Sequence, residues 1–437
     1  MYRLAYSLSL YLLLPVVLIR LWWRSLKAPA YRLRWRERFG YCPDYTGSKP
    51  LVWIHAVSVG ETLAAVPLVH AIQQGYPGYR VIMTTTTPTG SDRVRAVFGD
   101  GVEHVYFPYD LPDAVRRFLD RTRPVIAIIM ETELWPNTLN ACAKRKIPVV
   151  LANARLSEKS ARGYQRFAFL TRDALQNLSC VAAQNAVDGQ RFRRLGLPEE
   201  KLSVIGSIKF DLEIAEADRL AAARLKRFWS ASGAFNTVRT VWLAASTHPG
   251  EDERLLEVYK TLKQRYPALL LVLVPRHPER FQPVFSLCQS QNWRVENYSE
   301  LDVIKDGVLS GEVDIVIGNT MGELLRFYGA ADIAFVGGSL VPVGGHNLVE
   351  PAVWALPILA GPHLHNFSDM ARSLLRDQAM FVCDSVPMLE EHLFTLLEHP
   401  ALCEQMGQKA LAFAEKNRGS LQRLNELLAP YLANANA

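Results

Sequence analysis

The chain of 437 residues is poor in several features that would narrow its function at once. Its six cysteines are scattered without a C-x-x-C pair, which argues against a structural zinc site or a disulfide framework and indicates a reducing compartment. No D-x-D pattern occurs, and no histidine has metal-ligand spacing to the candidate glutamates described below. We therefore expect neither a bound metal nor a cofactor.

The chain also has only a small excess of positive charge. The 49 Lys and Arg residues outnumber the 43 Asp and Glu residues by six, and there is no arginine–aromatic RNA motif or zinc-finger spacing. This balance favours contact with anionic surfaces without indicating nucleic acid, so no nucleic-acid partner is expected. Hydrophobic residues make up 49% and charged residues 21%, which is typical of a globular protein, and the length favours two or three domains.

The N-terminus is mostly apolar over residues 4–19, and Trp22 and Trp23 follow at its border. This pattern favours a membrane anchor at 1–23, either a short transmembrane helix or a helix lying in the interface. No small-residue cleavage site follows, as a secretory signal would require. Positive charge beside an apolar segment stays cytoplasmic, so the rest of the chain is expected on the cytoplasmic side, against an anionic membrane surface. The basic residues are Arg20, Arg24, Lys27, Arg32, Arg34, Arg36 and Arg38.

Short apolar runs alternate with amphipathic stretches from Leu51 onward, and the pattern restarts near Thr240. Apolar strands separated by helices indicate parallel sheets covered on both faces, so we predict an α/β fold with two similar halves and a cleft between them. The expected domains are 24–210 and 211–415, with 416–437 as a C-terminal helix packing back toward the first domain. The expected strands are 51–57, 79–86, 103–107, 125–130, 147–152, 179–183, 240–245, 268–274, 313–317, 333–336 and 357–359. The expected helical segments are 62–74, 111–121, 158–176, 211–237, 251–265 and 386–433.

Ser58-Val59-Gly60-Glu61 follows the first expected strand and opens a helix. The spacing fits a capping box, in which Glu61 bonds back to the Ser58 backbone. It also fits a general base at the mouth of the domain, where partial removal from water raises the pKa of a carboxylate toward the working pH. The motif alone leaves both interpretations open.

Met130-Glu131-Thr132-Glu133 follows another apolar strand. If the strand persists, Glu131 and Glu133 point to the same side, although the absence of histidine partners makes a metal site weakly supported. Alternatively, Thr132 is the N-cap of a helix and Glu133 lies in its first turn.

Two basic residues are candidates for ligand contact. Lys209 lies at the crossover between the halves, either as a surface lysine or as a cation facing the cleft. Arg276 follows a strand, and Pro275 and Pro278 stiffen its loop. The planar fork of arginine suits a phosphate or a carboxylate, whereas His277 is expected to be a hydrogen-bonding loop residue.

Two further loops follow strands and open helices. Met321-Gly322-Glu323 lies in a small loop that lets a ligand approach backbone amides, and Glu323 also has a capping interpretation. In the stretch from Gly344 to Glu350, a helix is expected to start near His346, with Glu350 one turn further on the same face. That carboxylate can accept both hydroxyls of a ribose. The glycine order differs from G-x-G-x-x-G, so a dinucleotide fingerprint is not supported.

The sequence resembles the 3-deoxy-D-manno-octulosonic acid (Kdo) transferases in several long motifs that occur in order. They are Ser-Val-Gly-Glu-Thr at 58–62, Met-Glu-Thr-Glu-Leu-Trp-Pro-Asn at 130–137, Pro-Arg-His-Pro-Glu-Arg at 275–280, Met-Gly-Glu-Leu at 321–324 and the Gly-Gly-His-Asn stretch from 344 to Glu350. The resemblance extends from the N-terminal anchor to the tail at 427–431.

This resemblance implies a GT-B fold, with two Rossmann-like domains facing an interdomain cleft. It implies transfer of Kdo from CMP-Kdo to the lipid A precursor (lipid IVA) at the cytoplasmic face of the cell inner membrane, in lipopolysaccharide inner-core biosynthesis. By the same resemblance, Glu61 is the general base of an inverting reaction, while Glu131 and Lys209 support the transition state. The residues implied to hold CMP are Pro275, Arg276, Met321, Gly322, Glu323, Asn347, Leu348, Val349 and Glu350.

Two other functions fit parts of the sequence. A nucleotide-sugar epimerase on the same fold would process a UDP-sugar without an acceptor, and it would need no membrane anchor. A membrane-tethered nucleotide-binding scaffold would not require a carboxylate beside Glu131 and Lys209. The anchor and the carboxylates favour the transferase. Because CMP leaves with one phosphate, a cation and helix N-termini are expected to stabilise it without a metal.

Overall fold

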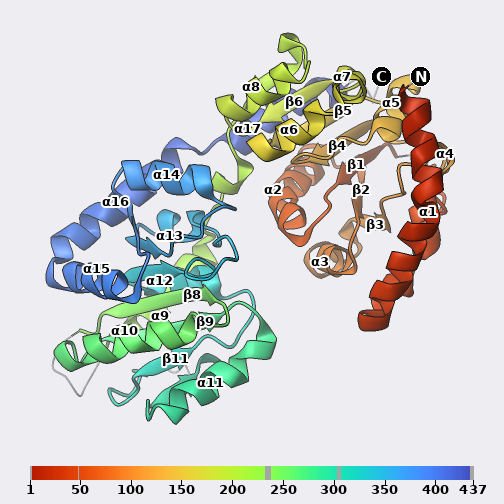
Figure 1. Ribbon diagram of the computed structural model, residues 1–437. Helices are drawn as coiled ribbons and strands as arrows, with labels where there is room; N and C mark the ends of the chain where they lie inside the picture. Colours follow the sequence, from red (N-terminus) through yellow and green to blue (C-terminus); the bar gives the residue numbers. More distant parts are fainter. Residues whose placement is uncertain (1, 48, 232–237, 302, 304–306, 434–437) are drawn as a thin grey trace. The chain divides into compact units, whose positions relative to one another are not determined.

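The computed structural model describes residues 2–47, 49–231, 238–301, 303 and 307–433 (Figure 1). The chain divides into two compact units, unit 1 (Met1–Asp211 with Arg418–Ala437) and unit 2 (Leu212–Asn417). Each unit contains a seven-stranded parallel sheet, which confirms the predicted α/β class. The ends of two segments expected to be helical, 232–237 and 434–437, lie outside the described residues.

The sheet of unit 1 has the strand order β3-β2-β1-β4-β5-β6-β7. Alternate residues of β1 enter two different apolar cores: Val52 and Ile54 pack under α2, α3 and α17, while Leu51 and Trp53 pack under α4, α5, α7 and α8. Helices on both faces explain why every residue of β1 and β4 is buried. The strands are β1 (Leu51–His55), β2 (Arg80–Thr85), β3 (Glu103–Tyr106), β4 (Ile126–Met130), β5 (Val149–Ala154), β6 (Cys180–Ala183) and β7 (Leu202–Val204).

The helices of unit 1 include one departure from expectation. The segment 158–176 forms two helices, because the backbone leaves the helical region at Phe167 and the Thr171 hydroxyl donates to the Tyr164 carbonyl. The helices are α1 (Tyr2–Lys27), α2 (Val59–Gly75), α3 (Pro88–Phe98), α4 (Pro112–Thr122), α5 (Pro136–Lys144), α6 (Glu158–Gln165), α7 (Ala168–Gln176), α8 (Ala186–Arg194) and α17 (Ser420–Ala433).

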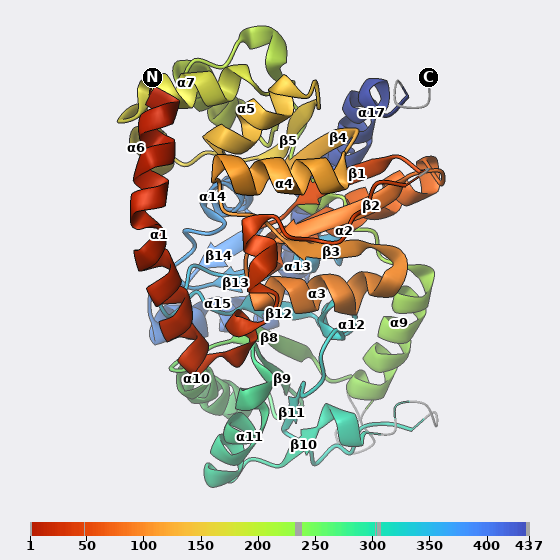
Figure 2. The same cartoon turned by 90° about the vertical axis from the view of Figure 1, so that its right-hand side faces the viewer.

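Helix α1 runs beside α5 and α7 of the same unit (Figures 1 and 2). It is 26 residues long and continues through Pro15, so it is longer than the apolar run alone indicates. The segment Tyr2–Leu26 is long and apolar enough to cross a membrane, by length and composition. The Ser7 hydroxyl donates to Asn137 Oδ1 of α5 at 3.1 Å, which ties this apolar helix to the unit at a polar point.

The sheet of unit 2 has the strand order β10-β11-β9-β8-β12-β13-β14. Its two apolar cores lie under α10, α11 and α15 on one face and under α9 and α12 on the other. The strands are β8 (Val241–Thr247), β9 (Leu270–Pro275), β10 (Val295–Asn297), β11 (Ile315–Ile317), β12 (Ile333–Val336), β13 (Ile358–Ala360) and β14 (Met380–Val382).

The helices of unit 2 confirm the predicted helix at 251–265 and show that the helical stretch 386–433 is divided into three, the last being α17 of unit 1. They are α9 (Glu216–Ser230), α10 (Asp252–Arg265), α11 (Phe281–Ser290), α12 (Leu324–Ala330), α13 (Val349–Val353), α14 (Ser368–Arg376), α15 (Val386–Glu398) and α16 (Pro400–Lys416).

Candidate active site

Glu61 lies in the first turn of α2, just beyond the carboxyl end of β1. Ser58 is the N-cap of α2, and its side chain accepts a hydrogen bond from the Glu61 N–H at 3.3 Å. In return, the Glu61 carboxylate accepts from the Val57 N–H at 2.8 Å and from the Ser58 hydroxyl at 2.9 Å. The predicted capping box is therefore confirmed, and its reciprocal bonds fix the direction of the carboxylate.

The surroundings of Glu61 also change its acidity. Burial raises the pKa of Glu61, and the nearby negative charge of Glu131 raises it further. The bonds from the Val57 N–H and the Ser58 hydroxyl oppose this effect by stabilising the charged form. A carboxylate that caps a helix can thus also be a stronger base than an exposed glutamate.

Glu131 directly follows β4, which ends at Met130. Its backbone has a φ of 56°, in the left-handed region, and its N–H donates to the Ala152 carbonyl of β5. The strand therefore does not persist, and the expectation that it carries Glu131 and Glu133 on the same side is wrong. The chain turns at Glu131 instead, which is a strained conformation for a residue with a side chain.

The alternative for this motif, in which Thr132 caps a helix and Glu133 lies in its first turn, is also wrong. Helix α5 begins at Pro136 with Trp135 as its N-cap residue. Proline suits the first helical position because it has no N–H to leave unpaired and its φ is already helical. Glu131 and Glu133 therefore belong to a loop.

Lys209 lies in a short 3₁₀ turn, Ile208–Phe210, near the end of unit 1. Its Nζ is 3.4 Å from Glu131 Oε1. The buried Asn153 holds this turn, because its Oδ1 accepts from the Ile208 N–H at 3.2 Å. Lys209 is thus a partly exposed lysine that forms an ion pair with Glu131.

Glu133 joins the same group, although the sequence argument did not select it as a site residue. Burial raises the pKa of Glu133 to about 7, and the negative charges of Glu61 and Glu131 add to the increase. Three carboxylates and Lys209 thus influence one another in unit 1. The E-x-E spacing in the sequence marks Glu133 as a candidate partner of Glu131. Its raised pKa could not be predicted, because it arises from burial in the folded protein.

The strand order explains why these residues meet. Strand β1 is paired with β2 on one side and with β4 on the other, although the chain passes through β2 and β3 before it reaches β4. The point where the order reverses is a topological switch point, and ligands of open α/β sheets bind beyond the carboxyl ends of the strands there. Glu61 follows β1 and Glu131 follows β4, so both lie at this position.

Pro275 and Arg276 lie at the carboxyl end of β9 in unit 2. Pro275 is the last residue of the strand and is buried, and the Arg276 N–H donates to the Thr247 carbonyl of β8 at 3.0 Å. The Arg276 side chain is partly exposed and makes no ion pair with any residue that the structure describes. His277 lies exposed in the loop, as predicted, and its backbone carbonyl accepts a hydrogen bond from the Arg280 N–H at 2.9 Å.

The segment Asn347–Glu350 leads into α13, and its Glu350 lies close enough to Arg276 to be influenced by its charge. Asn347 donates from Nδ2 to Glu350 Oε1 at 3.1 Å and accepts from the Val349 N–H at 3.1 Å, while Leu348 and Val349 are buried. Burial raises the pKa of Glu350, whereas the Asn347 bond and the positive charge of Arg276 lower it. These residues therefore form one electrostatic group with Arg276.

Helix α13 begins at Val349, so the expectation of a helix start near His346 is wrong. Gly344 and Gly345 both have positive φ values, of 111° and 76°, which keep the chain out of the helical conformation before this point. His346 and Glu350 consequently do not share a helix face.

Met321, Gly322 and Glu323 follow β11 and precede α12. Gly322 has a φ of 89°, and the Met321 side chain is exposed. The capping interpretation of Glu323 is wrong, because its side chain makes no cap bond and pairs instead with Arg326 at 2.8 Å. Within the described chain, no hydrogen bond or ion pair joins this loop to Arg276 or to Asn347–Glu350.

The described residues contain no cluster of three or more His, Cys, Asp or Glu side chains arranged to hold a metal ion. Each unit carries its own candidate group: three carboxylates with one lysine in unit 1, and residues around Arg276 in unit 2.

Solved structures place both units within one known architecture. A crystal structure of a glycosyltransferase from Rickettsia africae covers 89% of this chain and 100% of its own, with a TM-score of 0.56 and 13% identity. A UDP-GlcNAc 2-epimerase from Neisseria meningitidis bound to UDP-GlcNAc covers 87% of this chain and 100% of its own, with a TM-score of 0.58 and 15% identity. At these identities the likeness shows the fold alone, and that fold is GT-B, as predicted.

Sequence comparison separates the transferase from the epimerase. The family model of the 3-deoxy-D-manno-octulosonic-acid transferases (kdotransferases) matches residues 33–212. The transferase of Haemophilus influenzae is 41% identical over 438 residues, covering 99% of both chains. That of Bordetella pertussis is 34% identical over 440 residues, covering 98% of this chain and 99% of its own. The chain belongs to the Kdo transferase family, and it is therefore a glycosyltransferase.

Proposed function

We propose that this enzyme transfers Kdo from CMP-Kdo to a lipid A precursor and takes part in lipopolysaccharide inner-core biosynthesis. Membership of the family supports the transfer of Kdo. The observation that carries the chemistry is the meeting of Glu61, Glu131 and Lys209 at the switch point between β1 and β4. A sugar hydroxyl is a weak nucleophile, and a carboxylate at this position can take its proton.

Glu61 acts as the general base in this proposal. The acceptor hydroxyl passes its proton to Glu61 while its oxygen forms a bond to the anomeric carbon of Kdo. The bond from that carbon to the phosphate oxygen breaks, and its electron pair leaves with CMP. A single displacement of this kind inverts the anomeric centre, so a covalent Glu61–Kdo adduct trapped with a slow donor would contradict it. The raised pKa and fixed direction of Glu61 support its role.

Glu131 and Lys209 support the transition state. As CMP departs, the anomeric carbon becomes electron-poor, and a carboxylate held nearby stabilises developing positive charge. Lys209, 3.4 Å from Glu131, holds that carboxylate and offsets the negative charge of the glutamate group. Without the lysine, the nearby carboxylates would repel one another and at least one would bind a proton.

Unit 2 holds the donor nucleotide in this proposal, through Pro275, Arg276, Met321, Gly322, Glu323 and Asn347–Glu350. Arg276 supports this assignment, because it lies beyond the end of β9 without an ion-pair partner in the described chain. CMP carries a single phosphate, so arginine and hydrogen-bond donors suffice to offset its charge. We therefore propose no metal cofactor.

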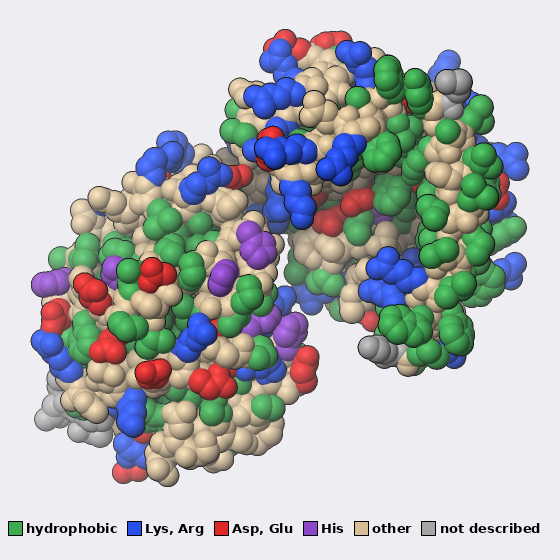
Figure 3. All heavy atoms as spheres, in the orientation of Figure 1, with side chains coloured by type: hydrophobic (Ala, Val, Ile, Leu, Met, Phe, Trp, Pro, Cys, Tyr) green, Lys and Arg blue, Asp and Glu red, His purple; other side chains and the backbone are tan. Residues whose placement is uncertain are grey.

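We further propose that α1 attaches the enzyme to the cytoplasmic face of the inner membrane, where the lipid acceptor lies. Figure 3 shows hydrophobic side chains exposed along this helix. The exposed residues include Leu4, Leu8, Leu12, Val16, Ile19 and Trp22. Because Ser7 and Tyr11 bond to Asn137 and Asp113 of the same unit, we favour a helix that lies in the membrane interface over one that crosses the membrane.

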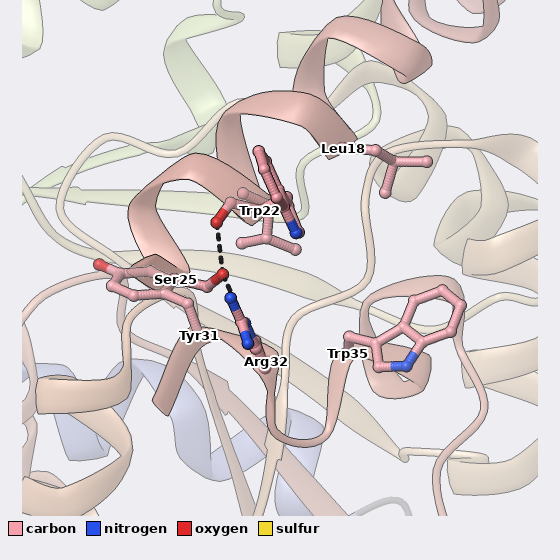
Figure 4. A pocket seen from close by; sticks show the side chains of 7 residues that line it. Leu18, Trp22, Ser25, Tyr31, Arg32 and Trp35 are labelled. Carbon is pink, nitrogen blue, oxygen red and sulfur yellow. Dashed lines mark hydrogen bonds between the residues drawn. The ribbon is translucent and has the colours of Figure 1, made fainter. Parts of the chain in front are cut away.

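Aromatic side chains also gather at the C-terminal end of α1 and in the segment that follows it. Trp22, Tyr31 and Trp35 line a pocket together with Arg32, which donates from Nε to the Ser25 hydroxyl at 2.9 Å (Figure 4). Tryptophan and tyrosine rings favour the headgroup level of a bilayer, and arginine favours its anionic surface. This composition supports contact with the cytoplasmic leaflet.

The reaction is tested by incubating the enzyme in detergent with CMP-Kdo and tetraacylated lipid A precursor and following the product by mass spectrometry. We expect the acceptor to gain the mass of one or more Kdo units, with CMP released in equal amount. Turnover of CMP-Kdo without any gain in acceptor mass would contradict the proposed acceptor. Conversion of UDP-GlcNAc without an acceptor would favour the epimerase.

The membrane proposal has its own test. Leu8→Lys with Leu12→Lys is expected to release the enzyme from vesicles containing phosphatidylglycerol, because two exposed apolar side chains that are proposed to enter the membrane become charged. Val308→Lys, at a similarly exposed apolar position of unit 2, serves as the matched control. Equal vesicle binding by both variants would contradict a membrane role for α1.

A further inference from the structure

His248 and His346 form a close imidazole pair in unit 2. Their Nε2 atoms are 2.8 Å apart, and the rings are stacked with centroids 5.1 Å apart and an angle of 10° between their planes. Between two neutral rings, this distance requires one Nε2 to carry a hydrogen and the other to accept it. The His277 ring meets His248 edge-on at 5.6 Å.

The pair lies at the switch point of the second sheet. Strand β8 is paired with β9 on one side and with β12 on the other, while the chain visits β9, β10 and β11 before β12. His248 directly follows β8, and His346 lies in the loop after β12. This is the position at which open α/β sheets bind ligands, and neither histidine takes part in the proposed mechanism.

A buried carboxylate holds both loops in place. Glu251 accepts hydrogen bonds from the backbone N–H groups of His248, Gly338, Ser339 and Leu340, at 2.9, 2.7, 3.0 and 2.9 Å. It is 0% exposed, so four N–H donors replace the water it has lost. The loop that carries His248 is therefore fixed against the loop after β12.

The backbone around the pair is built for close approach. A Cβ on Gly338 would meet the His346 ring at 3.0 Å, and the φ of Gly338 is +66°. Ser246 has a φ of 58°, although it is not a glycine. Strained positions of this kind persist where the surrounding structure enforces them, and they cluster at ligand sites.

The charged groups around the pair are mostly positive. Burial lowers the pKa of His346 to about 4, and the charge of Arg276 adds to this effect. Burial likewise lowers the pKa of His248. Both rings are therefore neutral near pH 7 in the absence of a ligand. The groups that face them are Arg276 and His277 after β9, Arg280 in its ion pair with Asp252, and Glu251 with its four N–H donors.

We infer that His248, His346 and Arg276 form a phosphate subsite that takes the phosphate of the cytidine nucleotide, and that the histidine pair takes up a proton when this phosphate binds. The inference deepens the proposed function and rests on it. One solvent proton converts the N–H···N pair into two N–H donors, so both rings can donate to phosphate oxygens. The phosphate changes from a singly charged diester in the donor to a dianionic monoester in CMP, so the added proton offsets charge that develops as CMP leaves.

The inference is tested by calorimetric titration of the full-length enzyme with CMP at about pH 7.5, where a phosphate monoester with a second pKa of about 6 is mostly dianionic. Comparing two buffers with different ionisation enthalpies gives the number of protons taken up. We expect uptake approaching one proton for the wild type and none for His346→Gln. The variant is also expected to bind CMP about 10-fold more weakly, because a charge-assisted bond is lost.

His399→Gln, which replaces an exposed histidine at the start of α16, is the matched control and should behave as the wild type. A second measurement uses only the wild type, so it does not depend on the folding of the variant. CMP affinity should fall as the pH rises above about 7, because binding takes up a proton while the charge of CMP itself no longer changes there. The absence of both proton uptake and this pH dependence in the wild type would overturn the inference.

Two other outcomes separate this inference from the donor proposal. If the wild type binds CMP-Kdo tightly and His346→Gln loses that affinity while its CMP binding is unchanged, the pair contacts the sugar carboxylate and the phosphate assignment is overturned. If the wild type binds neither CMP nor CMP-Kdo, the donor proposal fails together with the subsite.

Discussion

The two sheets carry opposite chemistry at the same topological position. In unit 1, the ends of β1 and β4 lead to Glu61 and Glu131, whereas in unit 2 the ends of β8 and β12 lead to His248 and His346. The strand order determines where a ligand can be met, and the side chains determine what kind of ligand that is. Acidic groups in unit 1 suit the removal of a proton, and the basic groups in unit 2 suit an anion.

Burial changes the pKa values of Glu61 and His346 in opposite directions, and in both cases it favours the neutral form. It raises the pKa of Glu61 and lowers the pKa of His346 to about 4, because both groups lose hydration of their charged forms. Glu61 becomes a stronger proton acceptor than an exposed glutamate. His346 is more fully neutral near pH 7 than an exposed histidine. The comparison therefore predicts that variants in unit 1 change turnover and variants in unit 2 change nucleotide affinity.

The largest expected effect is on turnover in unit 1. Glu61→Gln should lower kcat by about 10²- to 10⁴-fold, because an amide cannot accept the proton of the acceptor hydroxyl. Glutamine still fits the capping box, so α2 is expected to stay intact. The measurement is the initial rate of product formation with saturating CMP-Kdo and lipid acceptor, alongside the melting temperature. Wild-type turnover in this variant would exclude Glu61 as the base.

A smaller effect, on affinity, is expected in unit 2. Arg276→Lys should weaken CMP binding by about 10- to 100-fold, because an ammonium group cannot reproduce the planar fork of arginine toward a phosphate. Calorimetric titration with CMP gives the change. Arg254→Lys provides a control, since the Arg254 guanidinium donates to the Leu340 carbonyl at 3.1 Å and has no proposed role in binding CMP. Equal losses in both variants would indicate a general weakening of unit 2.

Glu133 sharpens the comparison through its pH dependence. Its folded pKa of about 7 lies above the ordinary 4.5, so its contribution to stability is present below about pH 4.5 and is lost as the pH rises through about 7. Glu133→Gln should therefore stabilise the enzyme at about pH 8, by about 2 kcal/mol after allowance for partial exposure, and change little at about pH 4.

Thermal unfolding at the two pH values measures this difference, with the exposed Glu200→Gln as the control. A variant with the same melting temperature shift at both pH values would mean that Glu133 is an ordinary carboxylate. The acid limb of the activity profile should also move to lower pH in Glu133→Gln, because one negative charge near Glu61 is removed.

The smallest expected effect comes from the cap itself. Ser58→Ala removes the bonds between the Ser58 hydroxyl, the Glu61 N–H and the Glu61 carboxylate, and should cost about 1 kcal/mol of stability. Turnover should fall by less than in Glu61→Gln, because the carboxylate remains and still accepts from the Val57 N–H. If Ser58→Ala lowers kcat as much as Glu61→Gln does, the capping role alone explains Glu61.

The sequence was most informative where apolar runs were long and local. The end of β4 at Met130 and the capping box at Ser58 were predictable, because each depends on neighbouring residues. The start of β1 at Leu51 was also predicted, but the strand ends at His55 and not at 57. Strands β7, β10 and β14 are edge strands with partly exposed side chains, so they lack the fully buried apolar run that marked the equally short β11 and β13. Their positions follow from pairing with neighbouring strands.

Local rules also failed where tertiary contacts decide. The left-handed backbone of Glu131 and the helix start at Val349 depend on how each loop is enclosed. Lys209 and Glu131 are 78 positions apart, and only the fold brings them together. The raised pKa of Glu133 likewise arises from burial, which no spacing of glutamates in a sequence reveals.

The division of roles between the two switch points is tested most directly by the donor affinity of Glu61→Gln. Calorimetric titration of this variant with CMP-Kdo, without acceptor, should give the wild-type dissociation constant while kcat falls by about 10²-fold or more. A donor affinity that falls in parallel with turnover would contradict the account, because Glu61 would then serve donor binding or the integrity of α2 and not proton removal.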